Sequence, residues 1–459
     1  MPASRFSLAV NGREYQLHDK LACFDPSSGG HPGGNDALDS QPDWSGAIVG
    51  LGYVGLPTAL ALHGRCPRII GIDVSEERLA AIAAQQADLA ETDRPRLEAA
   101  LADGSLELTS KAAAIAEADV VIVCVPTPVD GNYQPDLTAL RAACATVVDH
   151  ARPGQTIILT STTYVGTTRE LLTEPLAAKG LRAGSDVFVA FSPERIDPGN
   201  PDHVQRETPR VVGGATPECT QRAAWAISRL TDVVYLVSST DAAEATKLYE
   251  NIFRAVSLAL ANEFADACGT LGLDPIEVTL AAGTKPYGFL AAFPGPGVGG
   301  HCIPCDPHYL LWQLERQDRP SPLIEQAMRS IANRPGRVAD RAAELLAAGG
   351  TDLAGATVIV VGVAYKAGVQ DLRESPALPL IDDLTRRGAQ VRYYDPLVPE
   401  VRLPDGRVLS SVTAPDGGDY SLAIVHTLHP GVDYSWVAAC PQVLDGTYQF
   451  DGAPHRAVV

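Results

Sequence analysis

Long hydrophobic runs, clustered positive charge and a spaced cysteine framework are all missing from this 459-residue sequence. No apolar stretch approaches the ~20 residues that span a bilayer, and the start lacks the basic and apolar segments of a secretory signal. Lys and Arg number 36 against 55 Asp and Glu, a formal net charge of −19, which argues against nucleic-acid binding. The nine cysteines are scattered, as is typical of thiols in a reducing compartment. We therefore expect a soluble cytoplasmic protein with no membrane and no nucleic-acid partner.

The chain does contain two blocks in which short apolar strands alternate with helical segments, on either side of one long helical pattern. This order predicts an α/β fold: two Rossmann-like doubly wound domains joined by a long central helix. In the N-terminal extension, Asn11-Gly12 predicts a hairpin turn, and the Gly-, Ser- and Pro-rich segment 26–35 predicts a flexible linker; a disordered or mis-assigned start is the alternative. The expected regions are the extension (1–44), a dinucleotide-binding Rossmann domain (45–238), a central helical and dimerisation region with a cysteine-containing loop (239–346), and a second Rossmann-like domain (347–459).

A nucleotide fingerprint opens the first block. The strand Ala47–Val49 precedes a G-x-G-x-x-G turn and a helix, and the next strand, Arg68–Ile72, ends at Asp73. The glycines permit a tight turn and close approach of a pyrophosphate, and the acidic residue binds ribose hydroxyls. NAD is favoured, because a carboxylate repels the extra phosphate of NADP; a solvated helix residue is the alternative for the arginine of the set. The predicted cofactor residues are Gly50, Gly52, Tyr53, Val54, Gly55, Asp73 and Arg78.

Polar residues follow three more strands of this block. Because ligands bind beyond the carboxyl ends of strands in open α/β sheets, Thr127 and Thr162 are predicted to line the cofactor site. Glu194 is a candidate acid or base at the same edge. Turn hydroxyls and a solvated loop carboxylate are the alternatives. The strands and their following residues are Val120–Val125 with Thr127, Thr156–Leu159 with Thr162, and Val187–Ala190 with Glu194 and Arg195.

The longest helical pattern runs from about Thr240 to Cys268. Lys247 and Asn251 lie four residues apart, so they share one face of the helix and are a candidate oxyanion site. We expect the helix to act as a spine and as a dimer contact. Apolar residues at every fourth position predict an apolar stripe on another face; they are Leu248, Ile252, Val256, Leu260 and Phe264.

Residues 294–307 read Pro-Gly-Pro-Gly-Val-Gly-Gly-His-Cys-Ile-Pro-Cys-Asp-Pro. This segment, the thiol loop, cannot form a regular helix or a central strand, because glycine loosens the backbone and proline fixes φ and removes a donor. Such a loop holds Cys302 at a set position near backbone N–H groups, which suits a thiol nucleophile. The alternative is a surface loop with an inert buried cysteine.

The second block begins with the strand Ala356–Gly362 and continues with Gln390–Tyr394 and Leu422–Val425. It resembles a Rossmann half without the phosphate fingerprint. Lys366 and Arg373 follow its first strand and are predicted phosphate ligands, Lys366 for the substrate and Arg373 for the cofactor. The alternative is an interdomain salt-bridge cluster.

Taken together and in order, these motifs resemble the UDP-glucose/GDP-mannose dehydrogenase family from about residue 45 to about residue 450. Within that family, Thr284–Phe289 and Phe293–Gly297 look most like the UDP-N-acetylglucosamine 6-dehydrogenase branch. The motifs are Gly50-Leu51-Gly52-Tyr53-Val54-Gly55-Leu56-Pro57, Val125-Pro126-Thr127-Pro128, Ser192-Pro193-Glu194-Arg195, Lys247-Leu248-Tyr249-Glu250-Asn251, Gly299-Gly300-His301-Cys302 and Arg373-Glu374-Ser375-Pro376.

The resemblance implies a four-electron oxidation of a sugar C6 alcohol to a carboxylate, with two NAD⁺ used in succession. Cys302 would add to the aldehyde formed first, and the thiohemiacetal would then be oxidised to a thioester that water hydrolyses. A homodimer or a higher homo-oligomer is expected. The implied catalytic residues are Cys302, Asp306 as the base, Lys247 and Asn251 for the oxyanion, and Glu194 and Thr127 for water. The implied substrate-binding residues are Glu194, Arg195, Lys247, Asn251, Lys285, Gly299 and Lys366.

One position departs from the family pattern. Cys305 stands where the family has a lysine or an aliphatic residue, so Cys302 and Cys305 form a C-x-x-C. No second ligand pair completes a zinc site, and no metal is expected. We hypothesise an oxidation switch; a small apolar filler is the alternative.

The choice of sugar stays open at this point. UDP-N-acetylglucosamine is favoured, and UDP-N-acetylmannosamine, UDP-glucose and GDP-mannose are the alternatives. Two other classes of protein also remain: a two-electron dehydrogenase of the hydroxyacid type, which needs no Cys302, and a non-catalytic nucleotide-sugar-binding protein, which needs no nucleophile.

Overall fold

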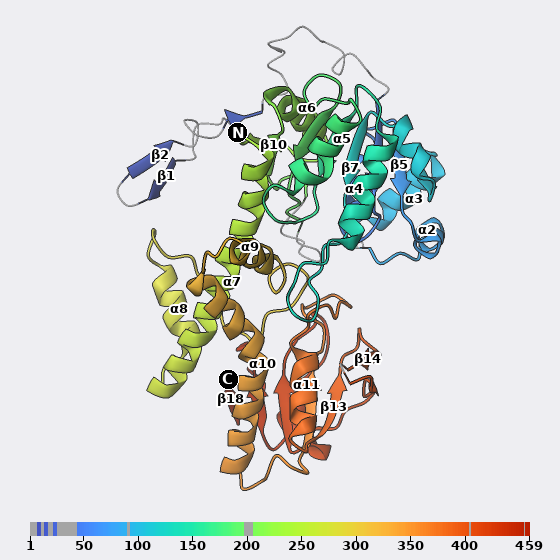
Figure 1. Cartoon of the computed structure of the whole chain (residues 1–459). Coiled ribbons are helices and arrows are strands. Elements are labelled where there is room, and N and C mark those ends of the chain that lie inside the picture. The colour runs from blue at the N-terminus through green and yellow to red at the C-terminus, as the bar shows by residue number, and fades with distance from the viewer. Residues whose placement is uncertain are drawn as a thin grey trace. The chain divides into compact units, whose positions relative to one another are not determined.

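The computed structural model describes residues 7–10, 13–16, 22–24, 44–89, 92–196, 205–403, 405–453 and 455–459, with only the backbone in the first two ranges. These residues form two compact units, the first ending at Tyr249 and the second beginning at Glu250 (Figure 1). The predicted α/β fold with a long helix between two sheet-containing parts is confirmed. Among the helices of the described ranges, none is both long enough and apolar enough to cross a membrane.

The first unit is built on a sheet of nine described strands. Six parallel strands follow the order β6-β5-β4-β7-β8-β9, which is the 3-2-1-4-5-6 order of dinucleotide-binding sheets. The strands, in spatial order, are β3 (Ala22–Cys23), β11 (Val234–Leu236), β10 (Arg210–Gly214), β9 (Phe188–Phe191), β8 (Thr156–Leu159), β7 (Val120–Val123), β4 (Ser45–Val49), β5 (Arg68–Ile72) and β6 (Leu106–Thr109).

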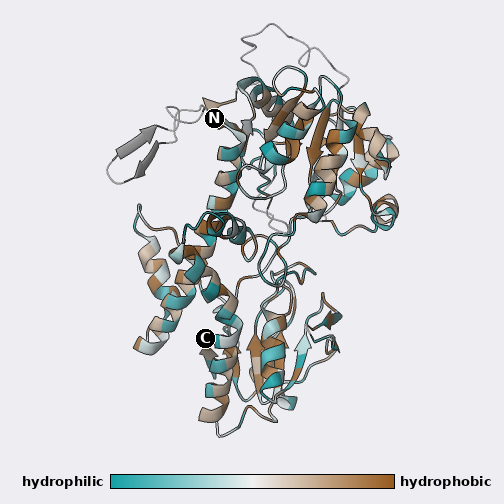
Figure 2. Cartoon of the chain, viewed as in Figure 1, coloured by the Kyte–Doolittle hydropathy of each residue, from teal (hydrophilic) through white to brown (hydrophobic). Residues whose placement is uncertain are grey.

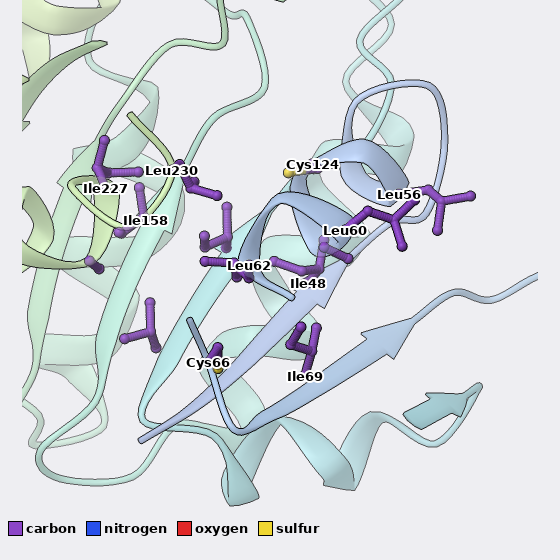
Figure 3. Close-up of a cluster of buried hydrophobic side chains, with 14 of the residues drawn as sticks. Ile48, Leu56, Leu60, Leu62, Cys66, Ile69, Cys124, Ile158, Ile227 and Leu230 are labelled. Carbon is purple, nitrogen blue, oxygen red and sulfur yellow. The ribbon is translucent and has the colours of Figure 1, made fainter. Parts of the chain in front are cut away.

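Helices pack on this sheet through a continuous apolar core (Figure 3). This cluster contains Ile48, Ile69 and Ile158 of the strands together with Leu56 and Leu60 of α1. Strands buried on both faces read as unbroken Val and Ile runs, which is why their sequence signal was strong. The helices of the unit are α1 (Gly55–Leu62), α2 (Glu76–Ala83), α3 (Arg94–Ala102), η2 (Ala112–Glu117), α4 (Thr138–His150), η3 (Arg169–Thr173), α5 (Glu174–Ala178) and α6 (Pro217–Ile227).

The N-terminal extension contributes two pieces of β-structure. β1 (Ser7–Val10) and β2 (Arg13–Gln16) pair antiparallel, which confirms the predicted hairpin; its turn at Asn11-Gly12 and the predicted linker 26–35 lie outside the described residues. The two-residue strand β3 pairs antiparallel with β11 at the edge of the nine-stranded sheet. A strand that short has no periodicity to read, so sequence patterning does not predict it.

The second unit holds a five-stranded parallel sheet in the order β13-β12-β16-β17-β18. This is the 2-1-3-4-5 order of doubly wound sheets, with its switch point between β12 and β16. α10 and α11 cover one face through Val338, Leu380 and their neighbours. The strands are β12 (Thr357–Val361), β13 (Gln390–Tyr394), β14 (Glu400–Arg402), β15 (Val408–Ser410), β16 (Leu422–Val425), β17 (Val443–Asp445) and β18 (Arg456–Val458); the helices are α8 (Pro275–Gly283), α9 (Asp306–Glu315), α10 (Pro322–Ala348), α11 (Ala377–Arg386), η4 (Gly417–Asp419) and η5 (Ser435–Ala439).

α7 (Thr240–Leu271) is the predicted long helix, but its apolar stripe is only partly buried. Leu248 and Ile252 are buried, whereas Leu260 and Phe264 are 65% and 44% exposed. A four-residue step overshoots one turn by about 40°, so the stripe winds around the helix. The small residues Ala255 and Ala259 are buried instead, against Met328 and Ile331 of α10. Figure 2 shows mixed hydropathy on the helices and apolar strands in both sheets.

Glu244, in the second turn of α7, binds the helix to the segment after β8. Its carboxylate accepts hydrogen bonds from Gly166 N at 2.6 Å, from Thr168 N at 2.8 Å and from Thr168 Oγ1 at 2.6 Å. Glu244 is 1% exposed, and this burial raises its pKa to about 7, although the hydrogen bonds from Thr168 and Gly166 act in the opposite direction. The segment that follows β8 is thereby tied to the helix that carries Lys247.

In the second unit, Arg334 of α10 joins three segments. Its Nη1 lies 2.6 Å from Asp266 Oδ1 of α7, and its Nε donates to Gly295 O of the thiol loop at 3.1 Å. The Arg334 side chain is 2% exposed. Arg337 pairs with the other oxygen of Asp266, but its side chain is 59% exposed. One carboxylate therefore has a buried and an exposed arginine partner.

The pH dependence of stability tests the burial of Glu244. The native chain keeps a proton that the unfolded chain, with an ordinary pKa of 4.5, has lost, so this group's contribution to stability falls as pH rises from 4.5 to about 7. Glu244→Gln removes this titration. Relative to the parent, the variant should gain on the order of 3 kcal/mol in unfolding free energy between about pH 5 and about pH 8, measured by urea unfolding. Glu263→Gln, on an exposed site of the same helix, controls for loss of a charge; a parent-to-variant difference for Glu244→Gln that stays constant with pH would contradict the prediction.

The two arginines that share Asp266 make a matched pair. Arg334→Met removes the buried partner of Asp266 and the donor to Gly295 O, and is expected to cost about 2–4 kcal/mol of unfolding free energy, because two hydrogen bonds of a charged group are lost. Arg337→Met should cost less than about 1 kcal/mol, because an exposed ion pair is screened by water. Denaturant unfolding measures both, and equal losses would show that burial does not govern this cluster.

Candidate active site

The G-x-G-x-x-G turn between β4 and α1 has the geometry that its glycines predict. Gly50 has φ +90°, a conformation that favours glycine. A Cβ on Gly55 would lie 1.8 Å from Gly50 O, so this close approach of turn and helix requires glycine. A Cβ on Gly52 would have no neighbour within 4 Å, because open space lies above this residue.

Asp73 and Arg78 both contact this turn. Asp73 follows β5 and accepts hydrogen bonds from Leu51 N at 2.8 Å and from Ser75 N at 2.9 Å. Arg78 Nε donates to Leu51 O at 2.9 Å. Arg78 is therefore part of the turn rather than a solvated helix residue. Each Asp73 oxygen has a second lone pair, so the half-buried carboxylate retains acceptor capacity for ribose hydroxyls.

These features fit NAD. The open space at Gly52 is where a pyrophosphate approaches, and the first N–H groups of α1 form the positive end of a helix dipole. Gly50, Gly52, Tyr53, Val54 and Gly55 make the turn itself.

Thr127 and Thr162 lie in the loops that follow β7 and β8, and Ser161 joins these two loops. Ser161 Oγ accepts a hydrogen bond from Val125 N at 3.0 Å and donates one to Val125 O at 2.8 Å. Both threonines are half-buried. Sequence reasoning missed Ser161, although its place next to Thr162 in a strand-end Ser-Thr-Thr run was the available signal.

Glu194 is held in a network rather than solvated. Its Oε2 lies 2.5 Å from Arg210 Nη1 of β10, and its Oε1 accepts from Arg195 N at 2.8 Å and from Ile196 N at 3.2 Å. Lys247 Nζ donates to Glu194 O at 2.8 Å. The structure thus brings together two predicted residues, Lys247 and Glu194, from segments far apart in the sequence. Arg210, 1% exposed, was missed because a strand residue in a Val-rich run carries no catalytic signal.

The thiol loop is fastened where it begins. Gly295 N donates to Asn262 Oδ1 of α7 at 2.9 Å, and Gly295 O accepts from Arg334 Nε. Asn262 and Arg334 are both buried. Neither was predicted from the sequence, because each lies in a helix with no motif around it. This clamp fixes the path of the chain toward Cys302.

The same loop packs against the segment after β12. Gly300, with φ +83°, donates from N to Arg373 O at 3.0 Å. A Cβ on Gly299 would lie 2.7 Å from Tyr365 Cβ, and one on Gly300 would lie 2.9 Å from Tyr365 Cε2. Glycine is required at both positions because Tyr365 leaves no room for a side chain.

Cys302 lies at the entrance to α9. Cys302 O accepts hydrogen bonds from Cys305 N at 3.1 Å and from Asp306 N at 2.7 Å, so residues 302–306 form the turn that leads into the helix. The positive end of a helix dipole favours a thiolate. Asp306 is 3% exposed, and its carboxylate accepts a short hydrogen bond from Asn251 Nδ2 of α7. Asn251 and Asp306, predicted separately, are therefore in contact.

The second sheet repeats the strand-turn arrangement of the first. Gly362 has φ +81° and donates to Tyr394 O at 2.7 Å, as Gly50 donates to Ile72 O at 2.8 Å. Asp395, after β13, accepts from Val363 N at 2.8 Å, as Asp73 accepts from Leu51 N.

The environments of the two aspartates differ. Asp395 is 1% exposed, and its oxygens also accept from Ala364 N, Leu397 N and Val398 N and contact His429 Nε2. Burial alone would raise the pKa of Asp395, but the hydrogen bonds to His429 and to the backbone hold it below its ordinary value. Its acceptor capacity is spent within the fold, so only Asp73 is available to a ribose.

The remaining predicted residues have mixed surroundings. Lys366 is half-buried in the loop after β12. Arg373 forms a bidentate pair with Asp371, with Nη2 to Oδ2 at 2.5 Å, so a phosphate would compete with this carboxylate. Lys285 is exposed, with Nζ 4.9 Å from the Tyr287 ring centroid. Over the described ranges, no group of three or more His, Cys, Asp or Glu side chains is arranged to hold a metal ion.

Comparison with known proteins matches three segments of the chain to one family. Three models of the UDP-glucose/GDP-mannose dehydrogenase family match: the NAD binding domain at residues 46–230, the central domain at 241–333 and the UDP binding domain at 359–455.

Individual relatives agree with this match. The chain is 36% identical to Protein CapL of Staphylococcus aureus, over 76% of this chain and 81% of the relative. It is 32% identical to a UDP-N-acetyl-D-glucosamine 6-dehydrogenase of Pseudomonas aeruginosa, over 83% and 90%. The solved structure of a UDP-D-ManNAc dehydrogenase from Pyrococcus horikoshii superposes with a TM-score of 0.82 at 30% identity, covering 90% of this chain and 98% of that one. The chain belongs to the UDP-glucose/GDP-mannose dehydrogenase family and is an NAD-dependent nucleotide-sugar dehydrogenase.

Proposed function

We propose that this enzyme oxidises the C6 hydroxyl of UDP-N-acetylglucosamine to a carboxylate, in a four-electron reaction that passes through a thioester on Cys302. The observation that carries the proposal is the position of Cys302, in a loop clamped at Gly295 and packed at Gly300, at the positive end of α9. A two-electron dehydrogenase has no use for a nucleophile held in this way, and a binding protein has none either.

NAD⁺ supplies hydride acceptance at the sugar C6 when it is bound. The chain's own contribution is to hold it: the backbone of the Gly50–Gly55 turn receives the pyrophosphate, and Asp73 accepts hydrogen bonds from the ribose hydroxyls. Thr127 and Thr162, in loops joined by Ser161, are proposed to line the same edge of the sheet. Arg78 stabilises the turn through the hydrogen bond from its Nε to Leu51 O. Arg373 remains our proposed further cofactor ligand.

In the proposed chemistry the Cys302 thiolate adds to the C6 aldehyde, forming a C–S bond and an oxyanion. Lys247 and Asn251, one turn apart on α7, are proposed to stabilise that oxyanion. Asp306, buried and hydrogen-bonded to Asn251, is proposed to take the proton of the alcohol and later of the water that cleaves the thioester. The covalent bond keeps the aldehyde on the enzyme between the two oxidations.

The network around Glu194 favours a positioning role over proton transfer. Its carboxylate already accepts hydrogen bonds from Arg210 and from two backbone N–H groups, which occupy its oxygens. Its backbone carbonyl orients Lys247. We propose that Glu194 and Arg195 shape the substrate edge of the first unit and that Thr127 positions water.

Our choice of sugar rests on the residues before Cys302. Thr284–Phe289 and Phe293–Gly297 are similar to the UDP-N-acetylglucosamine 6-dehydrogenase branch, and the Pseudomonas relative that bears this name matches over 90% of its length. UDP-N-acetylmannosamine is the second candidate, because the Pyrococcus structure superposes well and its title names this sugar. Lys285, Gly299 and Lys366 are proposed to contact the substrate.

We also propose that the chain forms a homodimer or a higher homo-oligomer. The outer face of α7 and the neighbouring α8 expose large apolar side chains, which a monomer in water would leave uncovered. Leu260, Leu271 and Leu280 are 65%, 72% and 58% exposed.

The number of NADH molecules formed per sugar tests the reaction. We expect two NADH per UDP-N-acetylglucosamine and a product with a new carboxylate, because the thioester route contains two oxidations. Cys302→Ala should lower the overall rate by on the order of 10³-fold or more. Cys268→Ala, a buried cysteine of α7, is the matched control and should retain the parent rate.

UDP-N-acetylmannosamine, UDP-glucose and GDP-mannose are assayed side by side with the favoured sugar. One NADH per sugar would overturn the thioester mechanism. A higher kcat/KM with another of these sugars, or no turnover of UDP-N-acetylglucosamine, would overturn the choice of substrate.

Asp73→Asn tests the cofactor site. The amide still accepts from Leu51 N but offers the ribose a neutral acceptor, and hydrogen bonds to charged groups contribute about 1.5–3 kcal/mol, so KM for NAD⁺ should rise about tenfold or more. KM for the UDP-sugar should not change. Asp88→Asn, on an exposed site of the same unit, is the control. An unchanged KM for NAD⁺ would show that Asp73 only supports the turn.

A further inference from the structure

Two thiols share the turn that leads into α9. Cys302 and Cys305 are joined through their backbones, since Cys305 N donates to Cys302 O at 3.1 Å. A four-residue turn closed in this way keeps its end Cα atoms within about 7 Å, and disulfides span Cα separations of about 4.4–6.8 Å. Pro304 restricts the backbone between them. The turn therefore already holds the two residues at a separation that suits an S–S bond.

The two cysteines differ in access to solvent. Cys302 is half-buried, whereas Cys305 is 4% exposed. A dissolved oxidant therefore meets Cys302 first, and the helix end behind it favours the thiolate, which is the reactive form. Cys305, three residues on, is placed to attack whatever forms on Cys302.

The other buried cysteines lack these features. Burial raises the pKa of the Cys66 thiol to about 11 and those of Cys124 and Cys144 to about 12, which disfavours their thiolates. All nine cysteines are thiols in the structure. The turn at α9 is thus where exposure, helix end and a second thiol coincide.

We propose that Cys302 and Cys305 form a hydroperoxide-reactive dithiol site, whose disulfide reversibly blocks the enzyme and protects Cys302 from irreversible oxidation. The loss of activity on oxidation rests on the proposed function, in which Cys302 is the nucleophile. The formation of the disulfide does not depend on that role. A thioester or thiohemiacetal on Cys302 would exclude the oxidant, so substrate should protect the site.

The chemistry balances with hydrogen peroxide as the oxidant. The Cys302 thiolate attacks one peroxide oxygen, the O–O bond breaks, hydroxide leaves and is protonated to water, and Cys302 becomes a sulfenic acid. The Cys305 sulfur then attacks Cys302 Sγ; the S–O bond breaks, and the hydroxyl leaves as a second water with the Cys305 proton. A dithiol reductant reverses the change by exchange, restoring both thiols and ending as its own disulfide.

The test treats the full-length enzyme with hydrogen peroxide and follows two independent readouts. Mass spectrometry of the peptide that contains both cysteines should show the loss of two hydrogen atoms in the parent, and activity should fall about tenfold or more and return with dithiothreitol. In Cys305→Ala the same peptide should gain one and then two or three oxygen atoms, and a 1,3-dione should label its sulfenic acid. Prolonged exposure of this variant should cause a loss of activity that dithiothreitol does not reverse.

Cys305→Val serves as a second variant should the alanine variant fold poorly, and Cys268→Ala controls for loss of a buried thiol. Parent peptide that gains oxygen instead of losing hydrogen would overturn the proposal. Full activity in a sample whose disulfide is confirmed by mass would overturn the block and, separately, the proposed nucleophile. Equal recovery of the parent and of both Cys305 variants after prolonged exposure would overturn the protective role.

Discussion

A loop rich in glycine and proline forms no regular helix or strand, so its backbone N–H and C=O groups lack hydrogen-bond partners within the loop. This constraint determines how the thiol loop is held in the second unit. The N–H and C=O groups of the thiol loop must find partners elsewhere. Gly295 finds them in Asn262 and Arg334, and Gly300 finds one in Arg373 O. The position of Cys302 is therefore set by side chains on α7 and α10 and by the segment after β12. The buried Arg334–Asp266 pair anchors this arrangement.

The two sheets share one turn structure after their first strand, but the surroundings of the aspartate in that structure differ. In each, a glycine with positive φ ends the first strand, and an aspartate at the end of the second strand accepts a hydrogen bond from the turn. Asp73 stays half-buried with acceptor capacity to spare, whereas Asp395 is enclosed by backbone donors and His429. One aspartate can therefore serve a ribose, and the other holds the fold together.

Two buried glutamates of the first unit are held by hydrogen-bond donors. Glu194 is compensated by Arg210, and Glu244 is surrounded by donors of the segment after β8. Both residues bear on Lys247: the backbone carbonyl of Glu194 accepts a hydrogen bond from Lys247 Nζ, and the carboxylate of Glu244 ties the helix that carries the lysine to the segment after β8. The same helix presents Asn251 to Asp306. α7 thus carries Lys247 and Asn251, and also Asn262, which holds the start of the thiol loop.

The sequence alone was sufficient for the elements whose signal is local. The strands Arg68–Ile72, Thr156–Leu159 and Leu422–Val425 were predicted at their observed bounds, because buried strands of parallel sheets are rich in Ile, Leu and Val. Gln390–Tyr394 was also predicted at its observed bounds, although it is an edge strand with exposed residues. The glycine turn and Asp73 were predicted because their spacing is imposed by backbone geometry. Ser161, Arg210, Asn262 and Arg334 were not, since each acts through a partner that is distant in the sequence. For α7 the sequence showed where apolar residues recur, but only the packing of α10 decided which part of the helix is buried.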